Sequence, residues 1–262
     1  MTKLREKIDN ILFIIQDNST GLMAGNLAFS LVLTMISLLA LLAIVLTSFN
    51  LDFIKASDLI PEPVKDVLLS SVNSSIGNVN LIVYVLAGLL VLRGAKALII
   101  ISNKIYEVPK EERGFKYFFK SLQMSLVVVL IIVTVAFLAV ASTRFIDIVY
   151  SKGVSVQKAH LVNTVLRLMS VLLSTSLLYL LISYIFRKAP SINLTHKDVR
   201  LGAIFTTISW LVFTKFYSYY IGLTYGESSF YGSMSNVITT MWWAYILSIF
   251  MVIGIKINKT KD

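Results

Sequence analysis

Residues Leu81–Tyr106 read LIVYVLAGLLVLRGAKALIIISNKIY, and this stretch decides the fold class. It is long and apolar enough to cross a bilayer as a helix, which takes about 20 residues. Arg93 and Lys96 lie inside it three residues apart, so they share a helix face that Ile100 and Asn103 continue. A cation at membrane depth costs about 2.5–3.5 kcal/mol and is by default a functional-site hypothesis. The alternative is that both side chains snorkel to the cytoplasmic interface.

The composition is that of a membrane protein. The chain of 262 residues is 56% hydrophobic and 15% charged, whereas soluble domains carry about 25% charged residues. It has no cysteine, which excludes disulfides, thiol catalysis and cysteine-based metal sites. The net charge of +10 does not predict a nucleic-acid partner, because lysine and arginine collect in the cytoplasmic loops of membrane proteins.

The apolar segments predict an all-α fold with a single membrane domain of six transmembrane helices. The expected spans cover about residues 24–48, 79–103, 122–143, 161–186, 201–222 and 233–255. Residues 1–20 read as an amphipathic cytoplasmic segment, and residues 52–78 as an external loop with a short amphipathic helix. Most lysines and arginines fall on the side of the termini, which predicts that both termini lie in the cytoplasm. Pro190 is expected to end one helix and Thr195 to cap the next.

Further polar residues lie inside the expected spans. We expect the cations and one amide to bind substrate, and they are Arg93, Lys96, Asn103, Arg167 and Lys215. Arg167 and Lys215 fall close enough to the outer interface that snorkelling explains them as well. Stripes of hydroxyl and amide side chains are expected to line a polar path, and these are Asn26, Ser30, Thr34, Asn163, Ser170, Ser174, Asn236 and Thr240.

Several stretches together resemble the YihY/BrkB family of six-span bacterial inner-membrane proteins. They are MAGNLAFSLVLTMISLLALL, RGAKALIIISNKIYEVPKEERGF, YIFRKAPSINLTHKDVRLGAIFTTISWLVFTKFYSYYIG and FYGSMSNVITTMWWAYILSIFMVIGIKIN. The residues that fit the family pattern are Pro190, Gly202, Trp210, Tyr231, Gly232, Ser233, Gly254 and Asn258. One departure is Lys256, which stands where the family's last span usually carries an acidic residue. The resemblance implies no agreed activity, although the old label ribonuclease BN accompanies the family.

The residues argue against the ribonuclease label. Metal-dependent phosphodiester cleavage needs clustered carboxylates, and the 14 acids of this chain are dispersed over loops and tails. Cleavage without a metal would use a histidine pair, but the only histidines, His160 and His196, fall in loops expected on opposite membrane faces. We therefore predict no enzymatic activity, no cofactor and no metal site.

No aspartate or glutamate falls in any expected span, which argues against proton coupling through a carboxylate. The cations that remain suit an anion, and arginine binds phosphate in bidentate fashion. The preferred hypothesis is a translocator of an anionic lipid or a lipid-linked headgroup, with membrane lipids as its partners. One alternative is a scaffold or assembly factor for envelope biogenesis, and another is efflux of a small organic anion, which would need a closed pocket. A homo-oligomer is compatible with the sequence, which does not determine the oligomeric state.

Overall fold

The computed structural model describes residues 18–48, 81–109, 114–131, 134, 156–224 and 232–259, and these residues form helices and short connections with no strand among them. The helices are α2 (Asn18–Ser48), α5 (Leu81–Ile105), α7 (Val156–Lys188), α8 (His196–Thr224) and α9 (Gly232–Lys259), with a further helix over residues 115–131. The expected all-α fold is confirmed. Residues 1–17 of the amphipathic segment and the loop of residues 52–78 lie outside the described residues.

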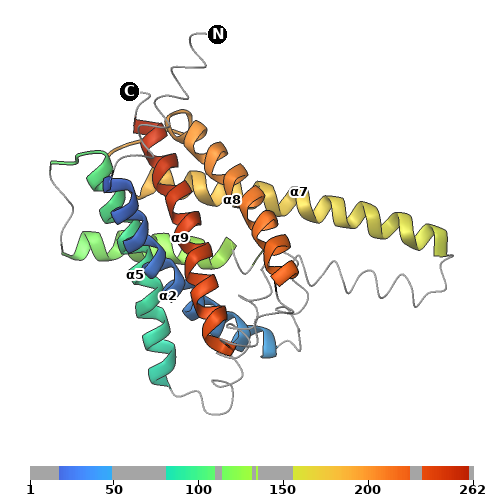
Figure 1. The fold of residues 1–262 in the computed structure, drawn as a ribbon. Helices are drawn as coiled ribbons and strands as arrows, with labels where there is room; N and C mark the ends of the chain where they lie inside the picture. The colour runs from blue at the N-terminus through green and yellow to red at the C-terminus, as the bar shows by residue number, and fades with distance from the viewer. Residues whose placement is uncertain are drawn as a thin grey trace, which may run out of the picture.

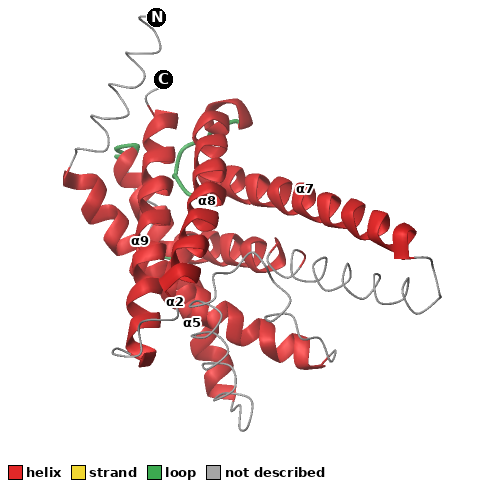
Figure 2. Ribbon diagram, turned by 45° about the vertical axis from the view of Figure 1, so that its right-hand side comes forward, coloured by secondary structure: helices red, strands yellow, loops and turns green. Residues whose placement is uncertain are grey.

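Four of these helices form a bundle. α9 packs against both α2 and α8, and α2 also packs against α5 (Figure 1). α7 contacts α8 near the end where the two are joined, and from there it extends sideways away from the bundle (Figures 1 and 2). The bundle therefore places the two cations of α5 on a helix whose main neighbour is α2.

The surface of the helices requires an apolar medium. Within the described residues, four stretches meet both the length and the hydropathy expected of a membrane span, and α5 is not among them: Ser19–Leu38, Leu168–Lys188, His196–Gly222 and Val237–Lys259. Only 22% of the α7 stretch is buried inside the protein, and its most exposed apolar side chains include Leu168, Met169 and Leu172. Exposed apolar surface of this extent marks contact with lipid or a partner. The chain is a polytopic membrane protein, while the count of six spans remains a prediction.

The helix ends follow local sequence signals. α5 ends in a Schellman motif, in which the N–H of Val108 donates to the carbonyl of Asn103 at 3.0 Å and Glu107 adopts a φ of 52°. α7 ends two residues before Pro190, as expected. At the start of α8, the N–H and hydroxyl of Thr195 both donate to the Asp198 carboxylate, at 2.7 and 2.6 Å. These ends hold the short loop of residues 189–195 in a defined place.

The contact between α8 and α9 is made by residues that carry the family resemblance. A Cβ atom at Gly202 would overlap the carbonyl oxygen of Gly254, so the two backbones touch there. The N–H of Gly202 donates to the side-chain oxygen of Asn258 at 2.7 Å. Further along, the indole N–H of Trp210 donates to the carbonyl of Leu247 at 2.8 Å. The pattern of small and polar residues is therefore explained by helix packing.

Candidate functional site

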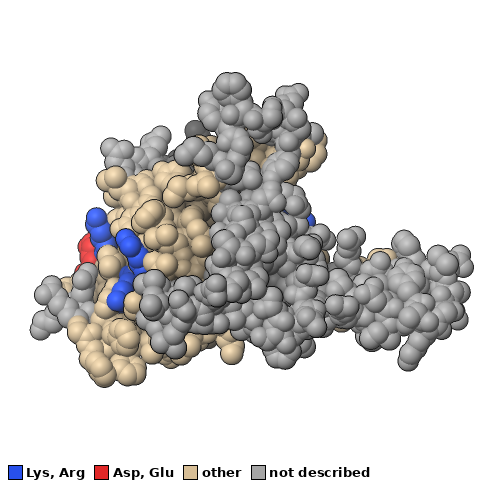
Figure 3. All heavy atoms as spheres, turned by 90° about the horizontal axis from the view of Figure 1, so that it is seen from below, with Lys and Arg blue, Asp and Glu red and all other residues tan. Residues whose placement is uncertain are grey.

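One face of α5 is open and cationic. Leu89 and Ile100 on this face are 54% and 48% exposed, and Arg93 and Lys104 are exposed with them. The opposite face is buried, with Ile99 fully inside the core. Arg93 lies twelve residues from either end of α5, which places it about 18 Å along the helix from each end. Seen from below, lysine and arginine atoms gather mainly on one flank of the described surface, with acidic atoms beside them (Figure 3).

Arg93 is backed by an aromatic ring from α2. Its guanidinium carbon lies 5.5 Å from the centroid of the Phe29 ring. A cation over an aromatic face gains about 0.5–1 kcal/mol at an exposed site, and about 2 kcal/mol or more when it is desolvated. Phe29 is itself 46% exposed. Arg93 thus lies at the seam, the line along which α2 and α5 meet, and its side chain is exposed.

The seam is narrow because small residues line it. A Cβ atom at Gly94 would overlap the side chain of Thr34, so α2 and α5 approach closely at this point. The Thr34 hydroxyl lies within hydrogen-bond distance of two carbonyls, that of Ser30 at 2.7 Å and that of Leu90 at 3.2 Å. The position of Arg93 against Phe29 therefore depends on close backbone packing one residue further along α5.

Lys96 and Asn103 lie at the edge of the open face. Lys96 is half-buried, and the Tyr117 hydroxyl from the helix of residues 115–131 donates to its carbonyl at 3.3 Å. Asn103 is buried, and Ser191 engages its amide: the Ser191 N–H donates to Oδ1 at 2.7 Å, and Nδ2 donates to the Ser191 hydroxyl at 3.2 Å. The structure thus brings Arg93 and Lys96 onto one helix surface and turns Asn103 toward the loop after α7.

The other residues expected in the site are spread over the molecule. Lys215 is exposed on α8, and the side chains of Arg167, Asn163 and Asn236 lie outside the described residues. On α2, Ser30 and Thr34 are buried between helices, whereas Asn26 is exposed. Ser170 and Ser174 are half-buried on α7, and Thr240 is buried on α9. These positions lie on α2, α7, α8 and α9, and their role in transport remains a prediction.

Acidic side chains in the described part of the chain lie away from Arg93. They are Glu107 and Asp198, and both are engaged elsewhere. Glu107 pairs with Lys259 at 2.6 Å, which lowers the pKa of the Glu107 carboxyl through a hydrogen bond and the lysine charge. Asp198 accepts hydrogen bonds from Thr195. Within the described residues, Arg93 therefore has an aromatic partner and no carboxylate.

Two residues of the structure have roles that the sequence pattern did not indicate. Phe29 was not predicted to lie at the site, because the sequence does not say which helix lies against Arg93. Lys256, at the position where an acid was expected, donates hydrogen bonds to Thr20 Oγ1 at 2.7 Å and to Ser19 Oγ at 3.3 Å. It joins the end of α9 to the first turn of α2.

The residues known to hold metals do not gather in the described ranges. No group of three or more histidine, cysteine, aspartate or glutamate side chains is found there. Metal-dependent nuclease chemistry has no ligand cluster in this part of the chain, and the absence of enzymatic activity remains a prediction.

Comparison with known proteins relates the chain to a protein family and to a curated relative. Residues 14–261 match the family described as virulence factor BrkB. The chain is also similar to the putative ribonuclease-like protein YfkH of Bacillus subtilis (strain 168), with 32% identity over 85 residues. That alignment covers 32% of this chain and 31% of the relative, so it spans about a third of the relative's length. No solved structure matches the chain.

Proposed function

Since the chain belongs to the virulence factor BrkB family, we propose that this membrane protein translocates an anionic lipid or a lipid-linked headgroup, with Arg93 and Lys96 as headgroup ligands. In this proposal the protein lies in a bacterial inner membrane with both termini in the cytoplasm. The observation that carries the proposal is the exposed guanidinium of Arg93 at the middle of α5, held over Phe29.

The geometry favours a lipid over a small soluble anion. A small anion is usually enclosed by its site, whereas Arg93 lies on an outer face beside the exposed apolar residues Leu89 and Ile100. A guanidinium there can bind a phosphate in bidentate fashion. The acyl chains of the same lipid can rest on the neighbouring apolar side chains. Lys96 is three residues further toward the end of α5, so it offers a second charge along the same direction.

The test is a lipid-translocation assay in proteoliposomes. The parent protein is compared with Arg93→Gln/Lys96→Gln, and with Lys104→Gln as a control for loss of charge on the same exposed helix face. The probes are fluorescent phosphatidylglycerol and fluorescent phosphatidylcholine, and the measured quantity is the rate at which dithionite quenches inner-leaflet label. We expect the parent to move the phosphatidylglycerol probe faster than the phosphatidylcholine probe. The rate for phosphatidylglycerol should fall at least tenfold in the double variant and stay at the parental level in Lys104→Gln.

Native mass spectrometry tests the same proposal independently, by recording which lipids stay bound to the purified protein. The parent should keep an anionic lipid that the double variant loses. If the double variant elutes as a folded protein and moves phosphatidylglycerol at the parental rate, the two cations are not headgroup ligands and the proposal is wrong.

A further inference from the structure

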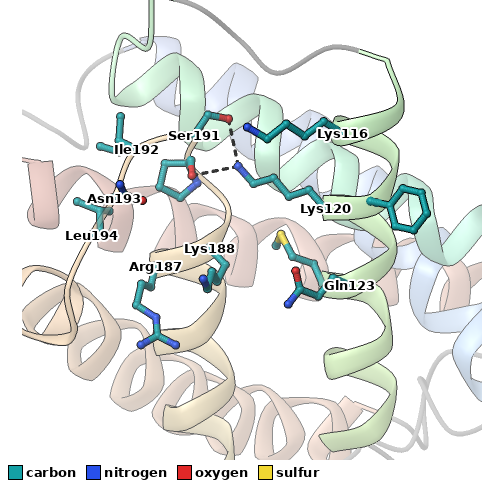
Figure 4. A pocket seen from close by; sticks show the side chains of 12 residues that line it. Lys116, Lys120, Gln123, Arg187, Lys188, Ser191, Ile192, Asn193 and Leu194 are labelled. Carbon is teal, nitrogen blue, oxygen red and sulfur yellow. Dashed lines mark hydrogen bonds between the residues drawn. The ribbon is translucent and has the colours of Figure 1, made fainter.

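A second cationic feature lies away from the open face of α5. A pocket of about 800 Å³ is formed between the helix of residues 115–131, the end of α7 and the loop that follows α7 (Figure 4). The described residues that line it include four cations, Lys116, Lys120, Arg187 and Lys188, and none of these described lining residues is acidic. Its size is that of a ligand site, which commonly measures about 300–1,000 Å³.

Hydrogen bonds build the walls of this pocket. Lys120 Nζ donates to the Pro190 carbonyl and to the Ser191 hydroxyl, each at 3.1 Å (Figure 4). Asn103 holds Ser191 from the side of α5. Arg187 lies 2.5 Å from the His196 ring nitrogen at the start of α8. Lys120 and Asn103 thus tie the loop to the helix of residues 115–131 and to α5, and the contact between Arg187 and His196 joins α7 to α8 beside the loop.

Helix stabilisation does not account for all four charges. Arg187 and Lys188 lie in the last turn of α7, where the partial negative charge of the helix end favours cations. Lys116 lies in the first turn of the helix of residues 115–131, where the partial positive charge of the helix start disfavours a cation, and Lys120 lies one turn further, where the helix end gives a cation no stabilisation. The general excess of cations in cytoplasmic loops explains the side of the membrane, but not why all four line the same pocket.

The charge and the size of the pocket together point to a ligand. Like charges around one cavity repel each other, and a cavity lined by one sign of charge concentrates counter-ions. We propose that this pocket binds the phosphoryl group of a ligand, either a phospholipid headgroup or a soluble phosphate ester, through Lys116, Lys120, Arg187 and Lys188. Arginine supplies a bidentate fork for phosphate, and the lysines supply movable point charges.

The position of the pocket lets a ligand enter from the membrane surface. Phe115, Phe118 and Phe119 are exposed on the same helix as Lys116 and Lys120, and Phe119 lines the pocket. Exposed aromatic rings beside lysines are typical of the interface between lipid headgroups and water. Both a lipid headgroup and a soluble ester can reach such a position.

The experiment measures binding of two probes to the full chain. Sodium pyrophosphate is titrated calorimetrically into the detergent-purified protein at low salt, and retention of phosphatidic acid is recorded by native mass spectrometry. The variants are Lys116→Gln/Lys188→Gln and the milder Lys188→Gln. The matched control, Lys104→Gln/Lys197→Gln, removes the same charge from exposed positions at this end of the bundle that do not line the pocket.

We expect the pocket double variant to weaken pyrophosphate binding at least tenfold, the single variant to weaken it less, and the control to retain the parental affinity. If the double variant loses both pyrophosphate binding and phosphatidic acid retention, the pocket binds the phosphoryl group of lipids and of soluble esters alike. Loss of phosphatidic acid alone supports a lipid headgroup, and loss of pyrophosphate alone supports a soluble ester. Equal effects of the pocket and control variants, or no effect on either probe, would overturn the proposal. The residues substituted here differ from Arg93 and Lys96, so the proposals for the pocket and for α5 can be refuted independently of each other.

Discussion

Asn103 is the residue that joins the end of α5 to the loop after α7. Its side chain is buried, and both of its polar atoms contact Ser191. Its place on the helix face of Lys96 had suggested a ligand-binding role. Because the protein itself occupies the amide, Asn103 acts at least as a positioning residue for the pocket wall.

Replacing Asn103 with alanine should therefore destabilise the protein by about 1–3 kcal/mol, because the Ser191 N–H loses its acceptor in a partly buried place. The measurement is the thermal unfolding midpoint in detergent. Asn193→Ala is the control, since Asn193 is exposed in the same loop. An unfolding midpoint equal to that of the parent would show that the contact with Ser191 contributes no net stability.

Glu107 links the end of α5 to the end of α9. Lys259 lowers the pKa of its carboxyl below the ordinary value of 4.5. The pair therefore adds stability above that value, and the contribution is lost as pH falls through the lower folded-state pKa. Glu107→Gln should reduce the unfolding midpoint slightly at pH 7, because the pair is exposed to solvent and screened. The difference from the parent should shrink as the pH falls below 4.5, vanish once the pH is below the lowered folded-state pKa, and also vanish in 1 M salt. A difference that persists under both conditions would mean that Glu107 acts through its backbone conformation, with φ at 52°.

At the level of elements, close helix contacts made by small residues position the site. Because Gly94 has no side chain, Thr34 of α2 can pack directly against α5. Because Gly202 has none, the backbone of α9 can approach α8 closely. In a membrane, helices associate through such packing and through hydrogen bonds, since the lipid is as apolar as their side chains. Larger side chains would force the helices apart.

Gly202→Ala should destabilise the protein strongly, by about 2 kcal/mol or more, because its Cβ would meet the backbone of Gly254 and the side chain of Asn258. Gly222→Ala lies on the same helix with nothing within 4 Å of the new Cβ, so it should be neutral or stabilising by about 0.5–1 kcal/mol. Thermal unfolding of the two variants side by side measures the contrast. Equal midpoints would show that the contact between α8 and α9 adapts to the extra methyl group.

At the level of the whole molecule, the packing at one end of the helix bundle relates the two proposed sites. The hydrogen bonds of Lys256 with α2 and the pair of Lys259 with Glu107 bring the start of α2 and the ends of α5 and α9 together at one end of the bundle. The pocket lies near the same end, because Asn103 of α5 contacts Ser191 in its wall. Arg93 lies about 15 Å from Asn103 along α5, farther from this end of the bundle.

Cysteine labelling tests the topology directly, because the chain has no cysteine of its own. Lys188→Cys should react with an impermeant maleimide only after the cells are opened. Ser71→Cys and Ser151→Cys, in the loops expected outside, should react in intact cells. Labelling of Lys188→Cys in intact cells would reverse the predicted orientation and place the cationic pocket on the outer side.

The sequence by itself determined that this protein is an all-helical membrane protein, since hydropathy and helical periodicity are local properties of the chain. It also identified Arg93 and Lys96 as unusual, because the cost of a charge in lipid does not depend on the fold. Only the tertiary structure placed Phe29 beside Arg93, turned Asn103 toward Ser191 and gathered Lys116, Lys120, Arg187 and Lys188 around one cavity. These contacts join residues far apart in the chain, and they depend on which helices pack together, which no single periodic pattern specifies.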